Sequence, residues 1–96
     1  MLTLSELKEW LRIDFSEDDN LLLSLLNASC ATIEVATGVS KDYVESCLED
    51  TLVELYKMIQ ILLITDLYNN ENGENKALTS YYIQLESEYM RCKNEN

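Results

Sequence analysis

The sequence predicts an all-α protein, a small single-domain bundle of four to five helices around a central apolar helix at about residues 51–69. The central segment is apolar at helical spacing nearly all round, and only Glu54, Lys57 and Gln60 form a narrow polar stripe. Proline is absent and glycine occurs only twice, so little interrupts helix. A chain of 96 residues is expected to form one domain.

The first helix begins at a T-x-x-E capping box formed by Thr3 and Glu6, and it ends near Arg12. Three leucines at helical spacing make its apolar stripe: Leu4, Leu7 and Leu11. Trp10 lies beside this stripe, and we expect it to pack over the next segment.

A tight connector follows, in which Ile13 and Phe15 are expected to insert into the core. Ser16 is a suitable N-cap for a second helix at about 17–36, whose first three residues are acidic. Negative charge there suits the helix dipole. The alternative, a metal site of the EF-hand type, lacks the required glycine and distal glutamate.

The inner face of the second helix is defined by apolar and small residues at helical spacing: Leu22, Leu25, Leu26, Ser29, Ile33 and Ala36, widened by Leu21, Ala28 and Cys30. Gly38 is the expected left-handed residue that ends this helix. Ser40 is a suitable cap for a short third helix at 41–49, and Thr51 begins a second T-x-x-E box. Either two helices or one bent helix agrees with this pattern.

Residues 69–76 form the only clear loop, and we expect it to be exposed. The last helix is predicted at about 77–92, followed by a frayed polar tail at 93–96. Four residues of this helix share one face: Leu78, Tyr82, Leu85 and Tyr89. Three apolar residues lie off that face and either cover a partner chain or are ordinary exposed residues: Tyr81, Ile83 and Met90.

The formal net charge of −11 disfavours binding to nucleic-acid phosphates and to anionic membrane surfaces. The acidity indicates either a solvated surface or a surface that repels DNA or docks onto a basic partner. The central helix is too short and too interrupted by charge to span a bilayer, which needs about 20 mostly apolar residues. No membrane partner is expected.

The residues do not predict an enzyme. Histidine is absent, the three cysteines have long spacings without CxxC, and no glycine-rich phosphate loop, HExxH or GxSxG pattern occurs. The cysteines indicate reduced thiols rather than disulfides or a zinc site. We therefore expect no catalytic residue, no cofactor and no metal. The six tyrosines suit packing and interfaces.

Several motifs follow one another in a recognisable order. Lys8 precedes the LRID sequence of residues 11–14, Asp18, Asp19 and Leu22 form a D-D-x-x-L phrase, and Thr37 and Gly38 end the second helix. The apolar helix carries MIQILLITDLYNNEN from Met58, and the C-terminus carries LESEYMRCK from Leu85. This order resembles that of the head–tail connector (DNA-packaging, head-completion) proteins of tailed bacteriophages. Two family features are missing: an arginine after the Tyr-Glu-Asn phrase and a proline before the central helix.

The resemblance implies a structural protein. Such connectors form a ring, commonly dodecameric, beneath the portal of the capsid. The ring extends the DNA channel and offers a docking surface to the tail or the next head-completion (head-closure) protein. The implied partners are other copies of the chain, the portal protein and the tail or head-closure protein, while DNA passes through without specific binding. The implied location is the head–tail interface of the virion, with assembly in the cytoplasm of the bacterial host.

A cyclic ring needs two different complementary patches on each subunit. The first candidate patch is at Arg12 and Asp14; the alternative is that Arg12 pairs within the chain with Asp14 or Asp19. The second candidate patch is at Tyr81 and Met90. The loop is a candidate to order on assembly or to project toward the channel, through Asn70, Glu71, Asn72, Gly73 and Glu74.

Two other functions agree with parts of the sequence. An acidic inhibitor that mimics DNA and blocks a nucleic-acid-binding enzyme would suit the size and charge. However, the carboxylates gather at helix caps, in the loop and near the C-terminus rather than at phosphate-like intervals along one helix. The other is a helical adaptor without ring symmetry.

Overall fold

The computed structural model of the chain describes residues 2–47, 50–68 and 76–94. Within these ranges all regular secondary structure is α-helical, so the predicted all-α fold is confirmed. The helices in chain order are α1 (Leu4–Leu11), α2 (Asp19–Thr37), α3 (Lys41–Ser46), α4 (Asp50–Tyr68) and α5 (Lys76–Asn94).

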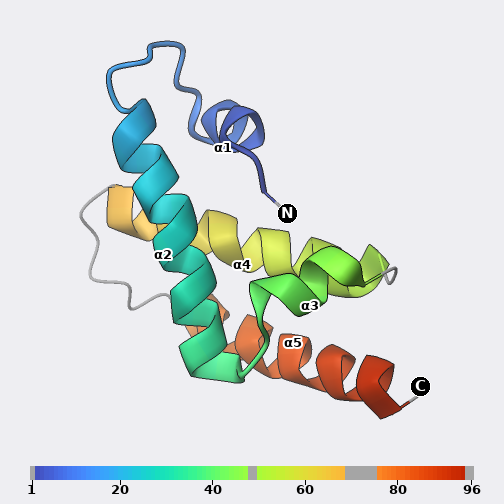
Figure 1. Cartoon of the computed structure of the whole chain (residues 1–96). Helices are drawn as coiled ribbons and strands as arrows, with labels where there is room; N and C mark the ends of the chain where they lie inside the picture. Colours follow the sequence, from blue (N-terminus) through green and yellow to red (C-terminus); the bar gives the residue numbers. More distant parts are fainter. Residues whose placement is uncertain (1, 48–49, 69–75, 95–96) are drawn as a thin grey trace.

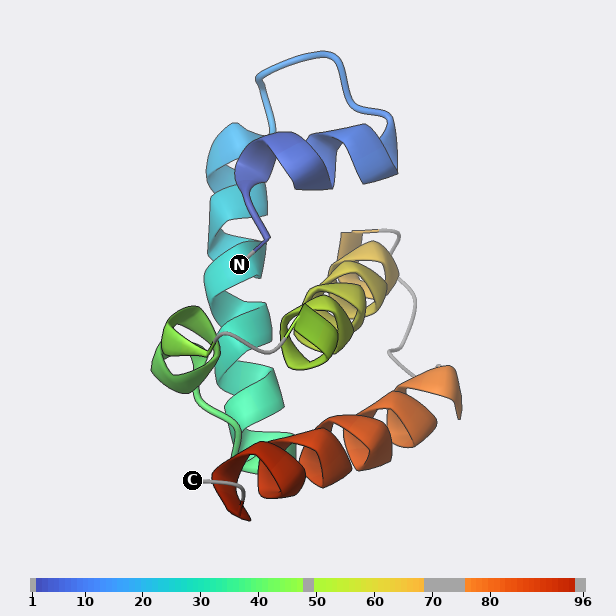
Figure 2. The same ribbon diagram turned by 90° about the vertical axis from the view of Figure 1, so that its right-hand side faces the viewer.

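α4 is the central helix, as the sequence predicts. It packs against each of the other four helices (Figure 1). α1 and α5 lie at opposite ends of α2, with α4 between them (Figure 2). An apolar helix of this kind is stable only when it is covered on several sides, which explains its position.

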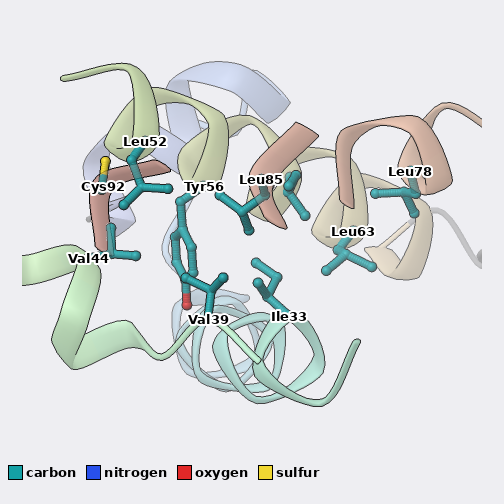
Figure 3. Packing of buried hydrophobic residues seen from close by; sticks show 10 residues of the cluster. Ile33, Val39, Val44, Leu52, Tyr56, Leu63, Leu78, Leu85 and Cys92 are labelled. Atoms are coloured by element: carbon teal, nitrogen blue, oxygen red, sulfur yellow. The ribbon is translucent and has the colours of Figure 1, made fainter. Parts of the chain in front are cut away.

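The larger part of the core lies where α2, α3 and α5 meet α4 (Figure 3). Its buried residues are Ile33, Val39, Val44, Leu52, Tyr56, Ile59, Leu63, Leu78, Leu85 and Cys92. A second cluster joins α1 and the N-terminal half of α2 to the other side of α4, through Leu2, Leu7, Ile13, Leu22, Leu26, Ile61 and Ile64. α4 therefore contributes to both clusters and holds the two ends of the molecule together.

Three predicted helix ends are confirmed. Thr3 and Glu6 form the reciprocal capping box at the start of α1. Gly38 ends α2 in the left-handed conformation with φ 78°. The Ser40 hydroxyl accepts the backbone N–H of Tyr43 at 3.1 Å and caps α3. Each of these ends depends on contacts within a few residues, which a local pattern can reveal.

The predicted N-cap of α2 is wrong. α2 begins at Asp19, so Asp18 rather than Ser16 occupies the N-cap position, and the Asp18 side chain makes no capping hydrogen bond. Its carboxylate instead accepts a 2.7 Å hydrogen bond from the hydroxyl of Tyr68, at the end of α4. The Asp18 carboxylate thus bonds to a residue 50 positions away in the sequence instead of to the backbone at the start of α2.

The connection between α3 and α4 differs from the prediction. α3 ends at Ser46 rather than near residue 49, because Cys47 adopts an extended conformation with φ −80° and ψ 136°. α3 and α4 are therefore two helices, not one bent helix. α4 begins at Asp50, which places Thr51 inside the helix rather than at its N-cap.

Several residues predicted to face the core are exposed. Trp10 is 60% exposed because it lies on the opposite flank of Leu7 from Leu4 and Leu11, and α1 packs through that side. Phe15 is 47% exposed because the connector from α1 to α2 arches away from the other helices (Figure 1). On α2, three predicted inner or flanking residues are exposed: Leu21, Ala28 and Ala36.

The predicted loop at 69–76 lies outside the described residues, except that α5 already includes residue 76. α5 also continues through Lys93 and Asn94, which the sequence pattern assigns to the tail. Residues 95–96 lie outside the described ranges.

α2 is apolar enough that its length and composition alone would permit a membrane span, and only 22% of its apolar window is buried in the structure. The same composition is found in core helices of proteins that do not cross a membrane. Here one side of α2 packs on α1, α4 and α5, and its other side is exposed.

Candidate assembly surfaces

Large apolar side chains are exposed at several places on an acidic chain. The most exposed are Val35 at 89% and Trp10 at 60%. The others are Phe15, Leu21, Leu23, Leu67, Ile83 and Met90. Single exposed apolar residues are ordinary on a protein surface. Where they lie beside a hollow or an unpaired charge, they mark candidate contact surfaces.

The first such surface is the α1 corner, which we define as Trp10 and Arg12. The two side chains line a shallow hollow of about 430 Å³ together with Glu9. Arg12 ends α1 in the left-handed conformation with φ 58°. It is the one non-glycine residue with positive φ in the described ranges. This conformation costs an ordinary side chain about 1–2 kcal/mol, so the corner holds an arginine where glycine would be favoured.

The alternative intrachain pairing of Arg12 is absent from the described part of the chain. Asp19 instead accepts an ion pair from Lys8, with Nζ and Oδ1 2.8 Å apart. Asp14 is exposed and forms no ion pair within the described ranges. The guanidinium of Arg12 therefore has no described carboxylate within 4.0 Å.

The second surface is the α4/α5 groove, a hollow of about 470 Å³. Its lining residues are Asp50, Thr51, Glu54, Leu55, Met58 and Tyr81. Leu55, Met58 and Tyr81 are half-buried and supply apolar walls, while Asp50 and Glu54 are exposed at the groove. Neither carboxylate has a lysine or arginine nitrogen within 4.0 Å in the residues that the structure describes.

A third surface is the α2 outer face, which we define as Ala31, Thr32, Val35 and Ala36. These four residues line a shallow hollow of about 350 Å³. Val35 follows buried Ile33 by two residues, which is more than half a helical turn, so it faces away from the core. Small residues around Val35 leave room for close approach of another chain.

The sequence-predicted site residues occupy three different places. Arg12 lies at the α1 corner with Asp14 just after it, and Tyr81 lines the α4/α5 groove. Met90 is 52% exposed and lies nine residues after Tyr81, about two and a half turns along α5, so the two residues face opposite sides of that helix. The predicted loop residues Asn70 to Glu74 lie outside the described ranges.

Sequence reasoning did not predict the contribution of α4 to the groove. The signal was present in the sequence. The polar stripe that contains Glu54 is flanked by Leu55 and Met58, and neither of these residues is among the buried residues of α4. It also did not predict the exposure of Trp10 or Val35. For Val35, its offset from Ile33 on the helix would have revealed the outer face.

The described residues hold no group of three or more histidine, cysteine, aspartate or glutamate side chains placed to bind a metal ion. The hollows are open and shallow, and their polar groups lie on exposed helix surfaces. Such an arrangement can bind another protein surface through apolar contacts and ion pairs.

The fold is that of a small all-α protein whose described surface carries exposed apolar residues. The family described as phage gp6-like head-tail connector protein matches residues 1–90, and the chain belongs to this family. No curated protein and no solved structure matches the chain. The match confirms the resemblance drawn from the LRID and D-D-x-x-L motifs. The protein is thus a structural connector of the phage virion that assembles with other head and tail proteins.

Proposed function

We propose that this protein forms a ring of identical subunits between the capsid portal and the tail or the next head-completion protein. The ring extends the channel through which DNA is packaged and leaves the head. The observation that carries this proposal is the family match, which covers nearly the whole chain. The subunits assemble in the cytoplasm of the bacterial host before the ring becomes part of the virion.

Ring closure requires each subunit to carry two different complementary surfaces. The α1 corner and the α4/α5 groove differ in charge. The corner carries Arg12, which has no carboxylate partner among the described residues, and the groove carries the carboxylates of Asp50 and Glu54. They are carried by different helices: the corner lies at the end of α1, and every groove residue except Tyr81 belongs to α4, which runs between α1 and α5 (Figure 2). This separation supports head-to-tail contact between successive subunits rather than contact within one subunit.

The charge of the chain supports passage of DNA without specific binding. Each subunit contributes a formal charge of −11, so a ring of many subunits concentrates negative charge around its channel. Phosphates are repelled by such a surface, because binding them requires clustered lysine and arginine. DNA that is repelled from the wall can slide.

The surfaces not used between subunits remain for the neighbouring proteins. The α2 outer face and the exposed Met90 side of α5 are candidates for contact with the portal and with the tail or head-closure protein. The loop from Asn70 to Glu74 is the candidate segment that orders on assembly or projects toward the channel. These assignments rest on exposure and on position in the sequence.

Native mass spectrometry over a rising concentration series tests the proposal. A closed oligomer, expected to be a dodecamer, forms alone or when portal rings are added. A chain that remains monomeric in both conditions overturns the ring. Tight, salt-sensitive binding of the monomer to a basic nuclease or polymerase would instead support the DNA-mimic inhibitor.

A further inference from the structure

We propose that the α1 corner of one subunit docks into the α4/α5 groove of a second copy of the chain. This inference rests on the proposed self-assembly and specifies its contact. Trp10 fills the apolar part of the groove, and Arg12 pairs with Asp50 and Glu54.

The apolar half of the contact is a large ring meeting half-buried apolar walls. Trp10 is 60% exposed in the isolated chain, which leaves most of an indole without packing. The groove has a volume of about 470 Å³ and presents Leu55, Met58 and Tyr81. Methionine and tyrosine both make favourable contacts with an aromatic ring. The indole N–H needs an acceptor when it is buried, and the carboxylate of Glu54 supplies one at the groove.

The ionic half of the contact follows from how the cations are used. Four cations in the described ranges pair with carboxylates: Lys8, Lys41, Lys57 and Arg91. Lys93 lies over the ring of Tyr89, with Nζ 5.3 Å from the ring centroid. Arg12 has neither kind of partner among the described residues, and it lies beside Trp10. On a chain of net charge −11, a guanidinium at the groove of a second copy is an uncommon and complementary group.

The backbone of Arg12 supports the same assignment. A left-handed arginine at φ 58° is strained where glycine would not be. Strain of this kind is retained at sites where the side chain has a role. The conformation also fixes the direction in which the chain leaves α1, which preorganises the corner before contact.

The chain contains a single tryptophan, so its fluorescence reports directly on this contact. As the protein assembles over a concentration series up to about 1 mM, the Trp10 emission is expected to shift to the blue. Quenching of Trp10 by acrylamide is expected to fall in step with the oligomer measured by native mass spectrometry. An oligomer whose Trp10 stays as quenchable as in the monomer overturns the docking and leaves the ring in place.

A charge-reversal cycle tests the ionic half. Arg12→Glu and Glu54→Arg are each expected to weaken assembly by at least about tenfold. The double variant is expected to recover to within about threefold of the original chain. Two exposed residues of α3 outside both surfaces provide the matched control, Lys41→Glu with Asp42→Arg, which is expected to leave assembly unchanged.

The outcomes separate the two proposals. Recovery in the double variant together with burial of Trp10 supports the docking. If the original chain forms an oligomer and each single variant assembles as well as it does, the docking is overturned but the ring is not. A chain that stays monomeric at every concentration and with portal rings overturns self-assembly, and the docking fails with it.

Discussion

Gln60 of α4 donates a 3.1 Å hydrogen bond from Nε2 to the Ser29 hydroxyl of α2, and both side chains are 1% exposed. The Ser29 hydroxyl in turn donates to the carbonyl of Leu26 at 2.7 Å. A buried polar pair of this kind links two helices at one register, because a shift of either helix leaves a buried amide without its acceptor.

Ser29→Ala is therefore expected to lower the free energy of unfolding by about 1–3 kcal/mol, since the buried Gln60 amide loses its oxygen acceptor and keeps only the weak acceptor Cys30 Sγ at 3.4 Å. Adding Gln60→Met removes the unpaired group and is expected to restore most of that loss. Urea unfolding of the two variants measures the difference. Ser24→Ala, at an exposed position of the same helix, is the control and is expected to change stability by less than about 0.5 kcal/mol. A double variant no more stable than Ser29→Ala would contradict this account.

Tyr56 predicts an alkaline limit to stability. Burial, followed by the nearby Cys30 thiol, raises the pKa of the Tyr56 phenol far above its ordinary value of 10.0. The folded state therefore holds the phenol proton more tightly than the unfolded state. The stability that Tyr56 contributes is complete below pH 10.0 and is lost as the pH rises above that value. The loss from one group is at most about 1.4 kcal/mol per pH unit.

Tyr56→Phe removes this titration and also removes a buried hydroxyl oxygen that has no hydrogen-bond partner among the residues that the structure describes. The variant is expected to be at least as stable as the original chain at neutral pH and to unfold at a higher pH. Circular dichroism during an alkaline titration measures both midpoints. Identical midpoints for the two proteins would show that Tyr56 is not the group that limits stability.

The capping box predicts a contrast between two threonines. Thr3→Ala is expected to cost about 1 kcal/mol, because the Thr3 hydroxyl accepts the backbone N–H of Glu6 at the start of α1. Thr51 lies inside α4 and is exposed, so Thr51→Ala is expected not to lower stability. Thermal unfolding of the two variants makes the comparison. Equal losses would mean that Thr51 also acts as a cap.

The same capping box makes the stability of the protein depend on pH in the acidic range. The hydrogen bond from the Thr3 backbone N–H lowers the pKa of the Glu6 carboxyl below its ordinary value of 4.5. The stability that the ionised Glu6 carboxylate contributes is complete above pH 4.5. It is lost as the pH falls through the lower pKa of the folded state. The cost of Glu6→Ala, which removes the acceptor of this hydrogen bond, is therefore expected to be smaller at about pH 3 than at about pH 7. A cost that is constant with pH would exclude the reciprocal half of the box.

Arg12 separates stability from assembly. Arg12→Gly relieves the left-handed strain and is expected to stabilise the monomer by about 1 kcal/mol, while the loss of the guanidinium weakens assembly. Arg12→Ala is expected to leave helicity intact and also to weaken assembly. Urea unfolding and native mass spectrometry report the two effects separately. Assembly that is unchanged in both variants would remove Arg12 from the contact.

The helices and several of their ends were predictable from the sequence, because they depend on neighbours within about four residues. Thr3, Gly38 and Ser40 act where their local patterns place them, and the apolar helix at about 51–69 is the central one. Two residues of the candidate surfaces, Arg12 and Tyr81, also stood out by residue type and spacing.

The remaining features depend on segments far apart in the chain. The Asp18 side chain does not cap α2; its carboxylate instead accepts a hydrogen bond from the hydroxyl of Tyr68, 50 residues later. Trp10 is exposed because α1 packs through the other flank of Leu7, and the groove beside Glu54 exists because α5 lies along α4. Local pattern determines which segments are helical and which faces are apolar. Only the packing of the helices decides which apolar faces are covered and which remain for another subunit.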